Sequence, residues 1–165
     1  MTRRAARLFA PLFVCVLAAL AGCGRGDPVQ GTAQTAAPSE PTSRDLGEFQ
    51  LHYNAVRTDM LTPEVARAYG IERSANRVLL NVSLQHENAD GTTSSADGLV
   101  TATAYNLTGQ TKDLTMRRIA EGSSVYYIGE VGISGNEILV FDINVVPPGQ
   151  HTKYTVQFKR EFYAD

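Results

Sequence analysis

The stretch Val78-Leu79-Leu80-Asn81-Val82-Ser83-Leu84-Gln85 decides the fold class of this chain of 165 residues. Its side chains alternate between an apolar face, formed by Val78, Leu80, Val82 and Leu84, and a second face that is mostly polar. Alternation with a period of about two residues is typical of a β-strand that buries one face. We therefore expect this strand to lie centrally in a β-sheet.

Stretches with similar alternation surround the central strand, and turn residues such as Asp90-Gly91 and Thr108-Gly109 separate them at intervals of about ten residues. The expected strands span residues 47–55, 78–85, 99–107, 112–121, 125–131, 138–146 and 154–158. Short strands with this spacing predict an all-β fold, a single antiparallel, immunoglobulin-like β-sandwich of about seven strands. A closed barrel of lipocalin type is the alternative, because it also consists of repeated short strands.

One short helix is expected between the first two strands. Thr62 is a typical N-cap residue, and Pro63 suits the first helical position. Gly70 can end the helix in a left-handed conformation. The segment 62–70 therefore predicts a helix of about two turns.

Two interpretations of this helix are open. If it packs on the sandwich, Val65 and Tyr69 are expected to be buried, because they lie four residues apart on one helical face. Glu64 and Arg67 are then expected to face water. If the segment is a recognition surface, the exposed pair matters for binding, and Tyr69 contacts a partner instead of the core.

The composition limits the chemistry of the folded part. The chain has 15 basic and 17 acidic side chains and two cysteines, Cys15 and Cys23. Removal of residues 1–22 would delete three arginines and no acid, which changes the formal net charge from −2 to −5. An acidic chain without a basic cluster is a poor candidate for nucleic-acid binding. Without a thiol beyond residue 23, the fold rests on its apolar core and not on disulfides.

The amino-terminal residues 1–22 have the layout of a secretory signal peptide: three arginines, an apolar run of about 13 residues and then small residues. The run is too short for a typical membrane span. The ending Leu20-Ala21-Gly22-Cys23 resembles the bacterial lipobox. This resemblance implies cleavage before Cys23 and lipidation of Cys23, which would hold the protein at the membrane.

Residues 23–45 form the expected lipidated amino terminus and flexible linker, because they contain few apolar side chains. Residues 46–165 form the expected β-sandwich domain. Gly24, and not an aspartate, follows Cys23, so we expect the protein at the outer membrane, facing the periplasm. The expected partners are the membrane, through the lipid, and an envelope protein.

Several separated motifs of the folded part resemble one known family. They are Tyr53-Asn54, Leu61-Thr62-Pro63-Glu64-Val65-Ala66, Ala68-Tyr69-Gly70-Ile71, Arg73-Ser74, Asn76-Arg77, Leu79-Leu80-Asn81-Val82-Ser83, Asn106-Leu107, Gly109-Gln110, Tyr126-Tyr127-Ile128, Phe141-Asp142-Ile143 and Phe162-Tyr163. Their order is similar to that of an exported bacterial family of unknown function, number 4426. The resemblance covers residues 46–165 and implies an exported single domain of gram-negative bacteria, with no catalytic or binding residue to carry over.

Motifs for catalysis, cofactors or metals are absent from the sequence. The three histidines (His52, His86 and His151) do not have a metal-ligand spacing. We therefore expect no catalytic residues, no cofactor, no metal site and a protein that is not an enzyme. A periplasmic enzyme that uses the loop carboxylates Asp90, Asp97 and Asp142 is one alternative, and a small-ligand carrier is another.

The candidate recognition patch consists of Arg73, Asn76 and Arg77, which follow the expected helix. Equally, these side chains could cap the helix end, where cations are favoured. The sequence thus favours a non-catalytic binding or interaction module at the membrane surface.

Overall fold

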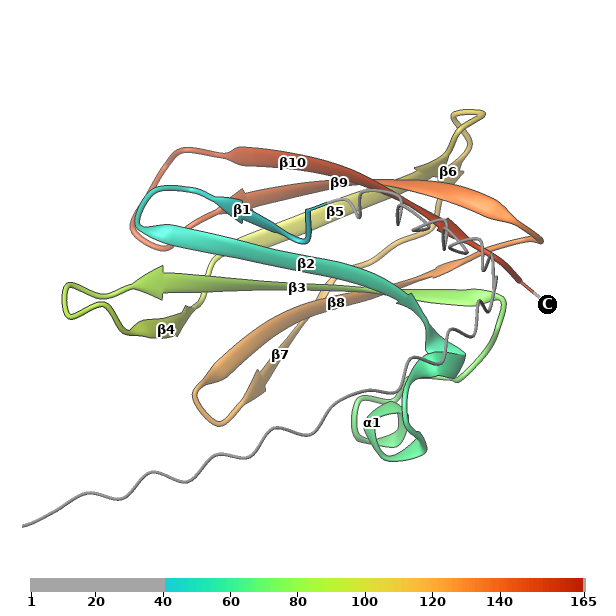
Figure 1. Ribbon diagram of the computed structural model, residues 1–165, viewed down its shortest axis with the longest axis horizontal. Coiled ribbons are helices and arrows are strands. Elements are labelled where there is room, and N and C mark those ends of the chain that lie inside the picture. Colours follow the sequence, from blue (N-terminus) through green and yellow to red (C-terminus); the bar gives the residue numbers. More distant parts are fainter. Residues whose placement is uncertain (1–40, 165) are drawn as a thin grey trace, which may run out of the picture. The chain divides into compact units, whose positions relative to one another are not determined.

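The computed structural model of the protein describes residues 41–164, in which ten strands form two antiparallel sheets (Figure 1). The predicted β-sandwich is confirmed, but it has ten strands and not about seven. The predicted signal peptide 1–22, Cys23 and the linker up to residue 40 lie outside the described residues.

The two sheets differ in size. The six-stranded sheet contains, in spatial order, β1 (Ser43–Asp45), β2 (Phe49–Arg57), β3 (Arg77–Glu87), β8 (Ser124–Gly132) and β7 (Arg117–Glu121), with β4 (Thr93–Ala96) paired to β3. The four-stranded sheet contains β10 (Tyr154–Phe162), β9 (Glu137–Val146), β5 (Leu99–Asn106) and β6 (Thr111–Lys112). Between β2 and β3 the chain forms the 3-10 turn η1 (Thr58–Met60) and the helix α1 (Pro63–Ala68).

The core lies between the facing sides of the two sheets. β3 lies between β2 and β8, so the central position predicted for this strand is confirmed. Its four inward side chains, Val78, Leu80, Val82 and Leu84, are fully buried. β9 supplies the corresponding set from the other sheet, with Leu139, Phe141, Ile143 and Val145. Burial of these two apolar faces against each other is the main favourable contribution to folding.

The strand predicted at residues 112–121 is wrong as a single element. β6 ends at Lys112 in the four-stranded sheet, and β7 begins at Arg117 in the six-stranded sheet. The residues between them cross over the core, where Leu114 and Met116 are half-buried. They lie so close to Gly129 of β8 that a Cβ atom there would come within 2.7 Å of Leu114 Cδ1. The alternating apolar residues Leu114 and Met116 therefore lie in the connection between the two sheets and not in a single strand.

The remaining differences concern short strands. β1, β4 and β6 have only 3, 4 and 2 residues, and they contain almost no apolar side chains to predict them. β1 lies within the range 23–45 that was predicted as linker. Ser43 pairs with His52 and Asp45 with Gln50, so backbone hydrogen bonds alone define this strand.

A buried tyrosine, Tyr127, holds the change of sheet between β4 and β5 in place. The hydroxyl of Tyr127 lies 2.6 Å from Asp97 Oδ1 and accepts a hydrogen bond from Gly98 N–H at 3.0 Å. Burial and the Asp97 carboxylate raise the pKa of Tyr127 to about 12. The hydroxyl therefore stays protonated and connects β8 to the crossover.

Candidate functional site

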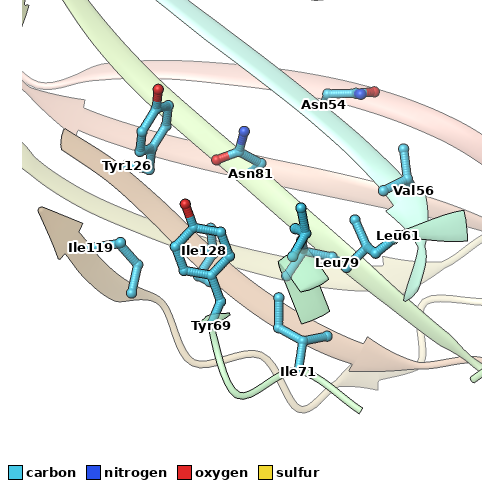
Figure 2. A pocket seen from close by; sticks show the side chains of 11 residues that line it. Asn54, Val56, Leu61, Tyr69, Ile71, Leu79, Asn81, Ile119, Tyr126 and Ile128 are labelled. Carbon is cyan, nitrogen blue, oxygen red and sulfur yellow. The ribbon is translucent and has the colours of Figure 1, made fainter. Parts of the chain in front are cut away.

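An apolar groove lies on the outer face of the six-stranded sheet, next to α1 (Figure 2). Its volume is about 290 Å³. We call it the α1 groove, and the residues that line it are Asn54, Val56, Leu61, Val65, Tyr69, Ile71, Leu79, Asn81, Ile119, Tyr126 and Ile128. The helical insert thus forms one wall, while β2, β3, β7 and β8 form the floor and the other wall.

The groove exists because this part of the sheet is apolar on both faces. Leu79 and Ile128 point outward from β3 and β8, and both are buried in a second apolar cluster with Ala66 and Ile71. α1 has only six residues, so it covers part of this apolar surface and leaves the groove beside it. The sequence signal was present in the run Val78-Leu79-Leu80, which offers apolar side chains to both faces.

Capping holds α1 in place. The Thr62 side chain accepts a hydrogen bond from Val65 N–H at 3.3 Å, so the predicted N-cap is confirmed. At the other end, Gly70 has a φ of 62°, the left-handed conformation expected after a helix. Arg117 of β7 donates a hydrogen bond to the carbonyl oxygen of Tyr69. The helix is therefore attached to the edge strand of the sheet.

The prediction that Val65 is buried is wrong, since its side chain is 39% exposed. Ala66 faces the sheet instead and is 3% exposed. Its small methyl group allows the helix to approach β3 and β8 closely, and this turns Val65 toward the mouth of the groove. Glu64 and Arg67 face water as expected.

Tyr69 is half-buried, between the buried position expected for packing and the exposed position expected for a recognition surface. Its ring lines the groove, and its hydroxyl donates a hydrogen bond to Glu121 Oε2 at 2.6 Å. This hydrogen bond raises the pKa of Tyr69 above its ordinary value, so the hydroxyl is protonated at neutral pH. Tyr69 thus packs against the sheet, and its ring forms part of the wall of the α1 groove.

One side of the groove is polar but uncharged. Figure 2 shows Asn81 between Asn54 and Tyr126, across from the apolar side chains. Asn81 Oδ1 is buried and has no hydrogen-bond partner among the described residues. A buried acceptor without a partner costs about 1–3 kcal/mol, so Asn81 is a strained polar position in the wall of the groove. None of the described residues that line the groove carries a formal charge.

The model of one family, described as a domain of unknown function (DUF4426), matches residues 43–165. The chain belongs to the DUF4426 family. A DUF4426 family protein from Pseudomonas aeruginosa PAO1, known from a crystal structure, is 31% identical, with a TM-score of 0.63. The match covers 74% of this chain and 94% of that protein.

A more distant solved structure has a similar fold. It is FetP of uropathogenic E. coli strain F11, which was recombinantly expressed in the periplasm of E. coli BL21(DE3). FetP is 14% identical, with a TM-score of 0.52, over 73% of this chain and 92% of FetP. Curated proteins offer no match to the chain.

The predicted recognition patch of the DUF4426 domain does not line the groove. Arg73, Asn76 and Arg77 are exposed, and each binds a local partner. Arg73 Nη2 donates a hydrogen bond to the carbonyl oxygen of Asp59 in η1 at 2.7 Å. Arg77 Nη1 forms an ion pair with Glu130 Oε2 at 3.7 Å. The backbone of Asn76 accepts a hydrogen bond from Ile133 N–H. These residues connect η1, β3 and β8.

The loop carboxylates of the DUF4426 domain are placed separately. Asp90 accepts hydrogen bonds from Thr92 within the β3–β4 turn, and Asp97 pairs with Arg118 at 2.7 Å. Asp142 lies in strand β9 and not in a loop, and its Oδ1 accepts a hydrogen bond from Gln157 Nε2 at 2.7 Å. Each carboxylate therefore has its own structural partner, and no observation favours a site that combines them.

Two further properties concern residues 41–164 only. This part of the DUF4426 domain has no group of three or more His, Cys, Asp or Glu side chains that could hold a metal ion. It also contains no helix that is both long and apolar enough to cross a membrane.

Proposed function

We propose that this protein is a non-catalytic binding module of the bacterial cell envelope, which takes a small neutral ligand or apolar group into the α1 groove. The observation that carries this proposal is the groove itself, with an apolar floor and the unpaired Asn81 acceptor at one side. Its volume of about 290 Å³ lies at the lower end of the range for small-molecule sites. The proposal includes a carrier role for the same ligand.

The chemistry of the lining defines the ligand. Apolar side chains such as Leu79, Ile119 and Ile128 favour an apolar body, because its transfer from water gains about 25 cal/mol per Å². The uncharged lining disfavours an ionic ligand, because burial of an unpaired charge is costly. Asn81 Oδ1 favours a ligand with one N–H or O–H donor near its apolar part.

Two observations support a place in the envelope. Residues 1–23 have the layout of a lipoprotein signal peptide, and the absence of an aspartate after Cys23 favours the outer membrane. FetP, a protein of similar fold, was produced in the periplasm, so this kind of sandwich is compatible with that compartment. We propose that the lipid on Cys23 holds the domain at the periplasmic side of the outer membrane.

A neutral fluorescent amine tests the groove. N-phenyl-1-naphthylamine has an apolar body and one N–H donor, and its emission rises in an apolar site. The purified protein is expected to bind it, and Val65→Asp is expected to weaken binding about tenfold, or about 1.4 kcal/mol, because a carboxylate at the mouth must be desolvated. Val65 is exposed enough to tolerate this substitution without loss of the fold.

Leu99→Asp serves as the control for the groove experiment, because Leu99 is an exposed apolar residue on the other sheet. This variant should bind the amine like the parent protein. Equal affinities of the parent and both variants would show that the probe does not bind in the α1 groove, and the proposed function would then be wrong.

The proposed anchor has its own test. In cells grown with labelled palmitate, the parent protein is expected to incorporate label, and Cys23→Ser is expected to lose it, because only the thiol of Cys23 can accept the diacylglyceryl group. The variant should also remain uncleaved or become soluble. Unchanged labelling of the variant would refute lipidation at Cys23.

A further inference from the structure

A second apolar hollow lies next to the α1 groove, where β2 and β10 end. Val56 lines both hollows. The residues that line the second hollow are Ala55, Val56, Arg57, Met60, Arg160, Glu161, Phe162 and Tyr163. Met60 is 72% exposed and Tyr163 is 54% exposed. We call this surface the Met60 face. Exposed apolar side chains gathered in this way mark an interaction surface.

The first described residues lie beside the middle of β2 and point backwards along it toward the end that carries the Met60 face. The carbonyl oxygen of Thr42 accepts a hydrogen bond from Tyr53 N–H at 2.9 Å, and Asp45 pairs with Gln50. Followed backwards from Asp45 to Thr42, the chain therefore runs along β2 toward the carboxyl end of that strand. β2 ends at Arg57, and Met60 follows directly in η1.

The proposed tether is short compared with the domain. Residues 24–40, between Cys23 and the first described residue, are rich in Gly, Pro, Ser, Thr and Ala. A flexible chain of this length has a root-mean-square span of about 20–25 Å, which is less than the length of β2, about 30 Å at 3.3 Å per residue. Such a tether holds the nearby surface of the domain at a millimolar effective concentration relative to the bilayer. A weak contact between this surface and the lipid is therefore formed for much of the time.

The charges of the Met60 face balance one another. Arg57 forms an ion pair with the neighbouring Asp59 at 3.0 Å, and the face also carries one further charge of each sign, on Arg160 and Glu161. A contact with lipid headgroups would therefore depend on apolar burial more than on anionic lipid. Tyrosine is favoured at membrane interfaces, because its ring is apolar and its hydroxyl is polar.

We infer that the Met60 face rests on the bilayer to which the lipid on Cys23 is anchored, with Met60 and Tyr163 in the interface. This inference rests on the lipid anchor of the proposed function, but not on ligand binding in the α1 groove. The contact orients the domain, so that the end carrying η1 faces the membrane and the opposite end, with the β3–β4 turn, faces away (Figure 1).

A single indole can test the orientation, because the chain contains no tryptophan. The full-length lipidated Met60→Trp protein is reconstituted into vesicles of phosphatidylethanolamine and phosphatidylglycerol with brominated acyl chains, which quench indoles at the bilayer. Leu99→Trp is the matched control. Leu99 is 67% exposed, and it pairs with Val146 at the end of β9 that lies away from η1 (Figure 1).

The indole of Met60→Trp is expected to be quenched about threefold more strongly than that of Leu99→Trp, since interfacial apolar side chains are buried about 5–10 Å into the headgroup/acyl boundary. Tyr163→Trp should give the same result as Met60→Trp. Omission of phosphatidylglycerol should change the quenching little, because the charges of the face are balanced.

Two outcomes would overturn the inference. The first is equal quenching of all three indoles in protein that carries labelled palmitate on Cys23. It would show that the anchored domain has no preferred orientation. A blue-shifted but unquenched indole in Met60→Trp would show that protein, and not lipid, covers the Met60 face. In both cases the label shows that the anchor itself is intact, and binding of the naphthylamine shows whether the groove is functional.

Discussion

Phe141→Ala is expected to lower the free energy of unfolding by about 3–5 kcal/mol, the usual effect of deleting a fully buried ring. The Phe141 side chain has no exposed surface, and its ring stacks on Phe158 with the centroids 5.0 Å apart. Phe158 also contacts Tyr53 from the other sheet. Loss of the Phe141 ring would therefore leave a cavity at the centre of the sandwich.

Leu80→Ala and Phe158→Ala should each destabilise the fold by about 2–5 kcal/mol for the same reason, since both side chains are buried. Leu99→Ala is the control, because Leu99 is exposed and surface changes are usually within about 0.5 kcal/mol. The free energy of unfolding of all four variants is measured by urea unfolding of the purified domain. Midpoints equal to that of the parent for the three core variants would contradict the packing described here.

The second large effect is expected at a nearly buried ion pair between β6 and β9. Lys112 Nζ lies 2.7 Å from Glu137 Oε1, and the two side chains are 14% and 12% exposed. Asn106 also donates a hydrogen bond to Glu137 Oε1 at 3.1 Å. Lys112→Met would leave the mostly buried carboxylate without its cation but with its hydrogen bond from Asn106, which is expected to cost about 1–3 kcal/mol at neutral pH.

The pH dependence of this effect follows from the carboxyl group. Burial raises the pKa of Glu137, but the hydrogen bonds from Lys112, Asn106 and Ser134 N–H outweigh it and hold the pKa below its ordinary value of 4.5. Because the folded-state pKa is depressed, the stabilisation is present above pH 4.5 and is lost as the pH falls through the lower value. The parent should therefore lose stability on acidification in this range.

In Lys112→Met, the buried carboxyl group has lost its cation, so acidification neutralises it and relieves part of the cost. The difference in unfolding midpoint between parent and variant should consequently shrink below about pH 4.5. Lys153→Met, which changes an exposed lysine, controls for the loss of one positive charge. A difference that stays constant between neutral and acidic pH would show that Glu137 does not cause the effect.

The sequence alone determined the class of fold and its central strand. Val78, Leu80, Val82 and Leu84 alternate with residues of the opposite face, and a period of two forces such a strand to bury one side. The cap of α1 was equally readable, because Thr62 and Pro63 act on the backbone within the next few residues. Local patterns of this kind need no knowledge of distant residues.

The short strands and the change of sheet were decided by tertiary structure. β1 is defined by hydrogen bonds to β2, and the side chains of Ser43 and Asp45 carry no signal for them. Leu114 and Met116 alternate like strand residues, but they cover Gly129, which lies far away along the chain. Backbone pairing and the close approach of distant residues do not leave a periodic pattern.

The α1 groove was also decided by tertiary structure, although its components are visible in the sequence. Val65 and Tyr69 share a helical face, yet only the packing of Ala66 against the sheet decides that Val65 turns toward the mouth of the groove. Leu79 of β3 and Ile119 of β7 are 40 residues apart in the sequence. They line the same groove because β8 pairs with both strands. The physical reason is that a groove depends on which surfaces remain uncovered after folding, and periodicity within one strand or helix cannot specify this.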